Sequence, residues 1–162
     1  MVSLVLVEDR YGVDFYSHVL RGIVKNIIIK RLIGARCNPK IERQIKALLF
    51  RYRIDKVAII VDSENDRLED VENDLENHVA RIRRIHSSIR IFIVQPYHEK
   101  LLCLGLGGDY RKCSTDPIGY IEHVISNRYQ HKMLGTMVRK INVGKILLDN
   151  TINDLINYLK DP

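Results

Sequence analysis

The sequence predicts an α/β fold, with a mostly parallel four-stranded sheet flanked by helices and followed by a helical C-terminal tail. Short apolar runs rich in β-branched residues alternate with longer segments whose apolar residues recur every three or four positions. The first pattern is typical of buried strands and the second of amphipathic helices. Strands and helices that alternate along a chain form parallel sheets with right-handed crossovers. The chain length of 162 residues suits a single domain.

The predicted core covers residues 1–95. In chain order its elements are a strand at 2–7, a helix at 12–25, a strand at 27–33, a helix from 38–39 to 53, a strand at 57–61, a helix at 68–82 and a strand at 89–94. Asn38 and Pro39 are typical of a helix start, as N-cap and first helical residue. The helix at 68–82 is the clearest, because its apolar residues are spaced 3, 4, 4 and 3.

Residues 96–162 are expected to form a mostly helical extension packed on this core. Asp116 and Pro117 again mark a helix start, as N-cap and first position. The segments 129–141 and 144–160 have helical patterns, and the second is amphipathic.

The cysteines and the apolar runs bear on where the protein resides. The three cysteines, Cys37, Cys103 and Cys113, have no zinc-like spacing, and we expect reduced thiols in the cytoplasm rather than a disulfide framework. No apolar run approaches the roughly 20 residues of a membrane span, and a signal peptide is not expected.

Charge is unevenly distributed along the chain. The net charge is +6, and the segment from Arg21 to Lys56 holds eleven Lys or Arg against two acids. The segment from Asp62 to Glu76 holds eight acids against one base. A basic surface beside an acidic pocket suits a nucleic-acid substrate, although a solvated helix face is the favoured interpretation of any single charged run.

Carboxylates follow two of the predicted strands. Glu8 and Asp9 come directly after the strand at 2–7, and Asp62 and Glu64 come directly after the strand at 57–61. Ligands of open α/β sheets bind outside the carboxyl ends of the strands. If the two strands are neighbours, these carboxylates converge and favour a bound cation, for which the interpretation is Mg²⁺ or Mn²⁺. The alternative is that they are ordinary polar residues at strand ends.

Glu8 together with Asp62-Ser63-Glu64 in an alternating α/β chain resembles the Toprim domain, a Rossmann-like catalytic module of topoisomerases, bacterial-type primases, recombination mediators and overcoming-lysogenization-defect nucleases. Residues 96–162 are similar to the last part of small stand-alone Toprim-like proteins. The resemblance implies that Glu8 is the general acid/base or a metal ligand, and that Asp62 and Glu64 hold the metal. Asp9 stands where the family usually has Gly, and Glu64 replaces a second Asp.

Other charged residues near these strand ends are candidates for an outer position. Glu99 and Asp9 are possible outer ligands, and Lys100 is a possible phosphate contact. Asp66 is a possible fourth ligand, but a helix N-cap is the favoured interpretation. His98 follows the last strand, where a surface histidine is the commoner role, and the remaining histidines share no metal spacing.

The leading hypothesis is therefore a Mg²⁺-dependent nuclease, with a role in DNA repair or defence. The second hypothesis is a non-catalytic module that binds nucleic acid or a partner protein. A homodimer is a possible assembly in either case. A receiver-like phosphoacceptor, using Asp62 after paired acids, is a third possibility, but the sequence offers no convincing fifth strand to carry the lysine that receivers need.

Overall fold

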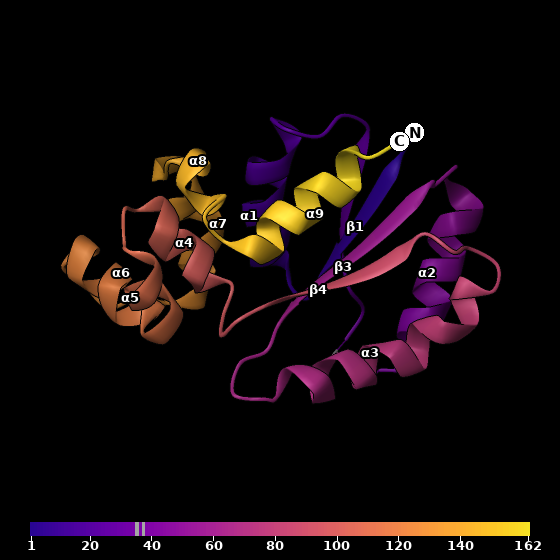
Figure 1. Cartoon of the computed structure of the whole chain (residues 1–162), viewed down its shortest axis with the longest axis horizontal. Helices are drawn as coiled ribbons and strands as arrows, with labels where there is room; N and C mark the ends of the chain where they lie inside the picture. The colour runs from indigo at the N-terminus through magenta and orange to yellow at the C-terminus, as the bar shows by residue number, and fades with distance from the viewer. Residues whose placement is uncertain (35, 37) are drawn as a thin grey trace.

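The computed structural model describes residues 1–34, 36 and 38–162. Within this part of the chain, four strands form one parallel sheet, as the sequence predicts, and the structure shows their order to be β2-β1-β3-β4 (Figure 1). The strands are β1 (Ser3–Val7), β2 (Ile27–Arg31), β3 (Lys56–Asp62) and β4 (Ile89–Val94). The order places β1 and β3 side by side at the centre, so the loops that follow them share one edge of the sheet.

Helices cover both faces of the sheet because β1 and β3 are apolar on both sides. Leu4, Leu6 and Ile59 face one layer, and Val5, Val7 and Ile60 face the other. The first layer consists of α2 (Lys40–Arg51) and α3 (Leu68–Arg83). The second consists of α1 (Arg10–Arg21), α9 (Asn150–Lys160) and the short helices between β4 and α9. The extension thus completes the hydrophobic core on one side of the sheet.

The extension is divided into more helices than its pattern predicts. They are α4 (Glu99–Gly105), α5 (Tyr110–Thr115), α6 (Pro117–Ile125), η1 (His131–Met133), α7 (Leu134–Met137), η2 (Val138–Lys140) and α8 (Val143–Ile146). The single helix predicted over 144–160 is wrong, because the buried Asp149 side chain accepts a hydrogen bond from the amide of Ile152 and starts a new helix there. The helical prediction for the segment 129–141 is confirmed over His131–Lys140, which forms three consecutive short pieces, η1, α7 and η2.

The predicted helix starts are partly confirmed. Asp116 caps α6 through the amide of Gly119, with Pro117 as the first helical residue. For α2 the predicted cap is wrong by one residue: Pro39 is the N-cap and Lys40 the first helical residue, although Asn38 accepts a 2.9 Å hydrogen bond from the amide of Lys40. The capping role favoured for Asp66 is wrong: α3 begins after Arg67, and Asp66 instead pairs with Arg36.

The prediction of reduced cysteines is wrong for two of the three. Cys103 in α4 and Cys113 in α5 form a disulfide, and both are fully buried. Gly108 packs directly against this disulfide. A Cβ at position 108 would lie 2.5 Å from one sulfur and 2.7 Å from the other, so there is no room for a side chain there. Cys37 lies outside the described residues. The cysteines therefore no longer favour a reducing compartment.

The two ends of the chain lie side by side (Figure 1). Met1 precedes β1, and the carbonyls of Tyr158 and Asp161 accept hydrogen bonds from the ammonium group of Lys56, the first residue of β3. Both ends are therefore at the amino edge of the sheet. None of the helices among the described residues has the length and apolar character that crossing a bilayer requires.

Candidate metal centre

Glu8 and Asp62 approach each other at the carboxyl edge of the sheet, as the sequence predicts. Val7 lies opposite Ile60 in the register of β1 and β3, so Glu8 follows β1 beside the last residues of β3. The backbone amide of Asp62 donates a 2.7 Å hydrogen bond to Oε1 of Glu8. The Asp62 side chain is almost buried, whereas that of Glu8 is 27% exposed. One carboxylate is thus enclosed and the other open to solvent.

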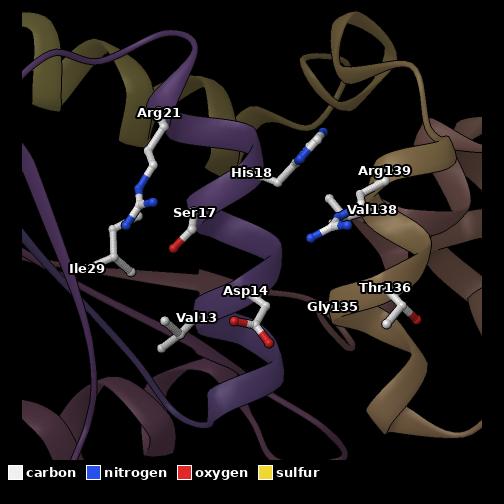
Figure 2. A pocket seen from close by; sticks show the side chains of 10 residues that line it. All are labelled: Val13, Asp14, Ser17, His18, Arg21, Ile29, Gly135, Thr136, Val138 and Arg139. Atoms are coloured by element: carbon white, nitrogen blue, oxygen red, sulfur yellow. The ribbon is translucent and has the colours of Figure 1, made fainter.

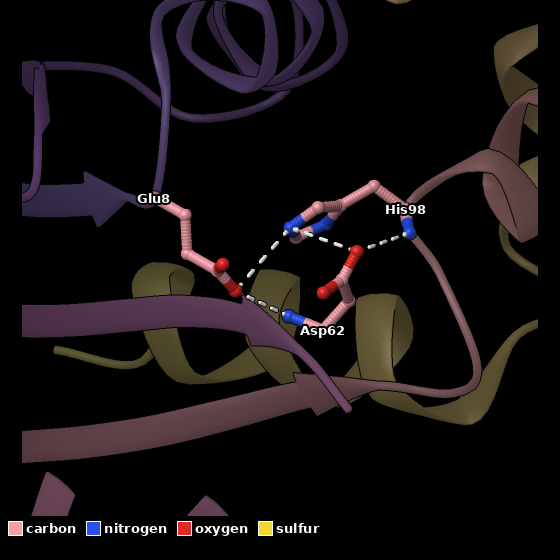
Figure 3. Close-up of side chains that lie close together, drawn as sticks. All are labelled: Glu8, Asp62 and His98. Atoms are coloured by element: carbon pink, nitrogen blue, oxygen red, sulfur yellow. Dashed lines mark hydrogen bonds and ion pairs between the residues drawn. The ribbon is translucent and has the colours of Figure 1, made fainter. Parts of the chain in front are cut away.

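His98, which follows β4, lies between these two carboxylates (Figure 3). Its Nε2 is 3.8 Å from Oε1 of Glu8 and 3.8 Å from Oδ2 of Asp62. The ligand atoms of the three residues all lie within 4.8 Å of one another. His98 is 2% exposed, so the interpretation as a surface histidine is wrong.

Buried contacts hold His98 in this position. Its Nδ1 is 2.8 Å from the hydroxyl of the fully buried Tyr16, and its backbone amide donates a 3.3 Å hydrogen bond to Oδ2 of Asp62. Nε2 is buried and has no hydrogen-bond partner among the described residues. With Nδ1 engaged by Tyr16, Nε2 is the ring nitrogen that faces the carboxylates.

The charges at this centre influence one another strongly. Burial raises the pKa of the Asp62 carboxyl to about 6, opposed by the charge of His98 and assisted by that of Glu8. Burial alone would lower the pKa of His98, but the neighbouring Glu8 and Asp62 outweigh it and raise the pKa above its ordinary value. Burial, together with the charge of Asp62, also raises the pKa of Tyr16, which stays a neutral phenol.

Glu64 is not part of this cluster. It adopts a left-handed backbone conformation with φ of +49°, its amide donates to the carbonyl of Pro96, and its side chain is exposed. It lines a neighbouring groove of about 460 Å³ together with Ser63, Lys100 and Tyr110. Its assignment as a metal ligand stays a prediction.

The four residues predicted for outer positions have other partners. Asp66 is exposed and pairs with Arg36. Lys100 is buried, where its ammonium group lies 2.7 Å from Asp149 and donates to the hydroxyl of Tyr110 at 3.2 Å. It therefore connects α4 to the start of α9.

Asp9 and Glu99 are joined by His131, a residue to which the sequence assigns no role. Its Nε2 lies 2.7 Å from Asp9 and its Nδ1 lies 2.6 Å from Glu99. Asp9 also caps α1 through the amide of Gly12, and Glu99 accepts a hydrogen bond from Tyr129. Hydrogen bonds to Asp9 and Glu99 raise the pKa of His131 to about 10, so it is a cation at neutral pH.

The donor set of the cluster fits a divalent cation. Carboxylate oxygens suit Mg²⁺ and Mn²⁺, and an imidazole nitrogen shifts the preference away from Mg²⁺ toward transition metals such as Mn²⁺. Tyr16 would orient the ligating ring, as outer partners of metal-binding histidines commonly do.

No protein-family model matches the chain, and no curated protein matches it in sequence.

Proposed function

We propose that this protein is a divalent-metal-dependent enzyme that acts on nucleic-acid phosphodiester bonds, most simply as a nuclease. The observation that carries the proposal is the buried Nε2 of His98, which faces two carboxylates and has no hydrogen-bond partner in the described part of the chain. A buried polar atom of this kind needs an explanation, and a cation bound by His98 together with the two carboxylates supplies one. The cluster also lies at the edge of the sheet where ligands of open α/β folds bind.

Asp62, His98 and Glu8 differ in exposure, and this difference supports different roles for them. Asp62 and His98 are buried and held by neighbouring groups, which suits ligands that must keep their geometry. Glu8 has one oxygen bound to the amide of Asp62, and its side chain is still accessible. Glu8 is therefore the group that can both contact the ion and move a proton to or from the substrate.

A bound Mg²⁺ or Mn²⁺ would activate water and offset the charge on a phosphodiester. The resemblance of Glu8 and Asp62-Ser63-Glu64 to the Toprim domain supports the same chemistry. In that domain paired acids hold the metal; here we assign this role to Asp62 with His98, and place Glu64 in the adjoining groove as an outer contact. The basic stretch from Arg21 to Lys56 supports a nucleic-acid substrate.

The test combines metal binding with cleavage. Single- and double-stranded DNA and RNA are incubated with the protein in Mg²⁺, in Mn²⁺ and in EDTA, and Mn²⁺ affinity is measured by calorimetry. We expect cleavage only with metal, and loss of both cleavage and Mn²⁺ binding in Asp62→Asn. Glu8→Gln should lose at least 100-fold in cleavage rate, whereas the exposed Glu69→Gln should behave as wild type. Cleavage that persists in EDTA, or in Asp62→Asn, contradicts the proposal.

The second candidate is a module that binds nucleic acid or a partner protein without cutting. The specific observation is that eleven basic residues lie between Arg21 and Lys56, and that those of β2 and α2 are largely exposed. This function predicts binding that weakens steeply with salt and survives Asp62→Asn. Fluorescence anisotropy with labelled oligonucleotides at two salt concentrations tests the nucleic-acid part of this function, because absence of binding even at low salt contradicts it.

A further inference from the structure

A polar cleft of about 740 Å³ lies between α1 and the α7–η2 segment, away from the Glu8, Asp62 and His98 cluster (Figure 2). One wall is a single face of α1, and the opposite wall is formed by residues 135–139. Ile29 of β2 contributes an apolar surface between them. The volume lies within the range of small-molecule sites, which bind in concave pockets with a few convergent polar groups.

The charges of this cleft are separated along its length. His18 extends from α1 on the side where Arg139 of η2 reaches toward that helix, whereas Arg21 extends along the other side of α1, toward Ile29 (Figure 2). Within the described residues, neither arginine has a carboxylate partner. Cationic groups that line a concavity concentrate positive potential there, and guanidinium groups recognise phosphate through paired hydrogen bonds.

The other end of the cleft has the opposite character. Asp14 lies one turn into α1, where the approach of Gly135 brings α7 close to α1. Asp14 and Arg21 are seven residues apart, which corresponds to about 10 Å along a helix axis. Ser17 lies between them and offers a hydroxyl. A ligand that fits this arrangement carries an anion at one end and hydroxyl or amino groups at the other.

We propose that the cleft is a binding site for a small organic phosphate of nucleotide size. The phosphate binds Arg139 beside His18, and the hydroxyl- or amine-bearing body extends across the face of α1 toward Asp14 and the apolar surface of Val13 and Ile29. The carboxylate of Asp14 disfavours a continuous phosphodiester strand, whose charge would repeat at that end. The site is separate from the proposed metal centre and does not depend on it.

The experiment is a calorimetric titration of the full chain in EDTA with AMP, ribose 5-phosphate and inorganic phosphate, which separates a nucleotide from a sugar phosphate and from phosphate alone. We expect saturable binding of an organic phosphate, weakened about 10-fold or more in Arg139→Gln and in His18→Gln. Lys140→Gln, an exposed charge beside the cleft, is the matched control and should change affinity less than 2-fold. Asp14→Asn should weaken the organic phosphate but leave inorganic phosphate unchanged.

Amide chemical-shift mapping with the same ligands locates the site without any variant. Shifts confined to α1 and residues 135–139 support the proposal. No organic phosphate binding at millimolar concentration, shifts elsewhere in the chain, or equal losses in Lys140→Gln overturn it. Tighter binding of a single-stranded oligonucleotide by Asp14→Asn than by wild type also overturns the proposal. That result would mean that the cleft binds a nucleic-acid strand and not a small organic phosphate.

Discussion

The backbone amide of Asp62 donates a 2.7 Å hydrogen bond to Oε1 of Glu8, 54 positions earlier in the chain. The contact exists because β1 and β3 are neighbours in the sheet and end at the same edge. The sheet itself therefore fixes one oxygen of Glu8, while the side chain stays 27% exposed. A carboxylate that is both fixed and accessible can contact an ion and a substrate together.

Removal of the Tyr16 hydroxyl is expected to weaken metal binding without touching a ligand. In Tyr16→Phe the imidazole of His98 loses its 2.8 Å partner at Nδ1. Loss of such an outer contact typically lowers metal affinity by about 10- to 100-fold. Calorimetry with Mn²⁺ measures the change.

The control for this prediction is Tyr11→Phe. Tyr11 packs its ring against His131 and not against His98. We expect wild-type Mn²⁺ affinity in this variant. Equal affinities for wild type and Tyr16→Phe would mean that His98 does not hold the ion.

Two glycine substitutions in and after α1 should change stability in opposite directions. A Cβ at Gly12 would lie 2.7 Å from Cγ1 of Val7, a stiff buried side chain at the end of β1. Gly12→Ala should lower the free energy of unfolding by about 1–3 kcal/mol through overpacking. Gly22 has open space around it and a negative φ. Gly22→Ala should therefore raise the free energy of unfolding by about 0.4–1 kcal/mol. Urea denaturation of both variants checks the signs; a stabilising Gly12→Ala would contradict the packing.

The bridge made by His131 should stabilise the protein in a defined pH range. The pKa of His131 is about 10 in the folded protein, above the value of about 6.5 for an unfolded chain. A raised folded-state pKa gives stability that is fully present below pH of about 6.5 and is lost as pH rises toward about 10. Because the side chain is 41% exposed, solvent screening limits the contribution to about 1 kcal/mol.

The measurement compares wild type with His131→Asn by urea denaturation at several pH values. The difference in free energy of unfolding should be largest near pH 6 and shrink by pH 10. His123→Asn, an exposed histidine without such partners among the described residues, is the control and should show no such trend. A difference that grows with pH would contradict the assignment of His131 as a cation.

The disulfide should contribute measurably to stability. Cys103 and Cys113 are 10 positions apart, and closing a loop of this size stabilises a fold by about 3 kcal/mol in the chain-entropy model. A reductant should lower the free energy of unfolding of wild type by about this amount and leave a Cys103→Ser, Cys113→Ser double variant unchanged. Thiol titration in denaturant should find two more thiols after reduction than before. The same thiol count before and after would show that the bond does not form.

Local pattern was enough to predict the framework of the sheet and one part of the site. The apolar runs of β1 and β3 are followed at once by carboxylates, and parallel strands end at the same edge, so the meeting of Glu8 and Asp62 could be expected. The position of His98 gave a usable signal, since it follows β4 at this edge. The sequence pattern gave no sign that His98 is buried. In the structure its ring contacts Tyr16 of α1, which is 82 positions away in the chain.

Other parts of the arrangement had no local signal. His131 reaches Asp9 across 122 positions, and this contact depends on how the short helices of the extension fold back on α1. The break between α8 and α9 depends on Asp149, whose partner Lys100 belongs to another helix. Glu64 has the spacing of a ligand, but it has a left-handed backbone conformation and is not among the three residues of the cluster.

The adjacent chain ends, held near β3 by Lys56, have a practical consequence. A purification tag, fluorophore or surface tether attached at either end would lie at the amino edge of the sheet, across the molecule from Glu8, Asp62 and His98. Immobilised or fused protein should therefore present its carboxyl edge to a ligand unobstructed. A short peptide joining Pro162 to Met1 would also allow the chain to be reopened at an exposed turn, such as the one around Asn127, to give a circularly permuted form.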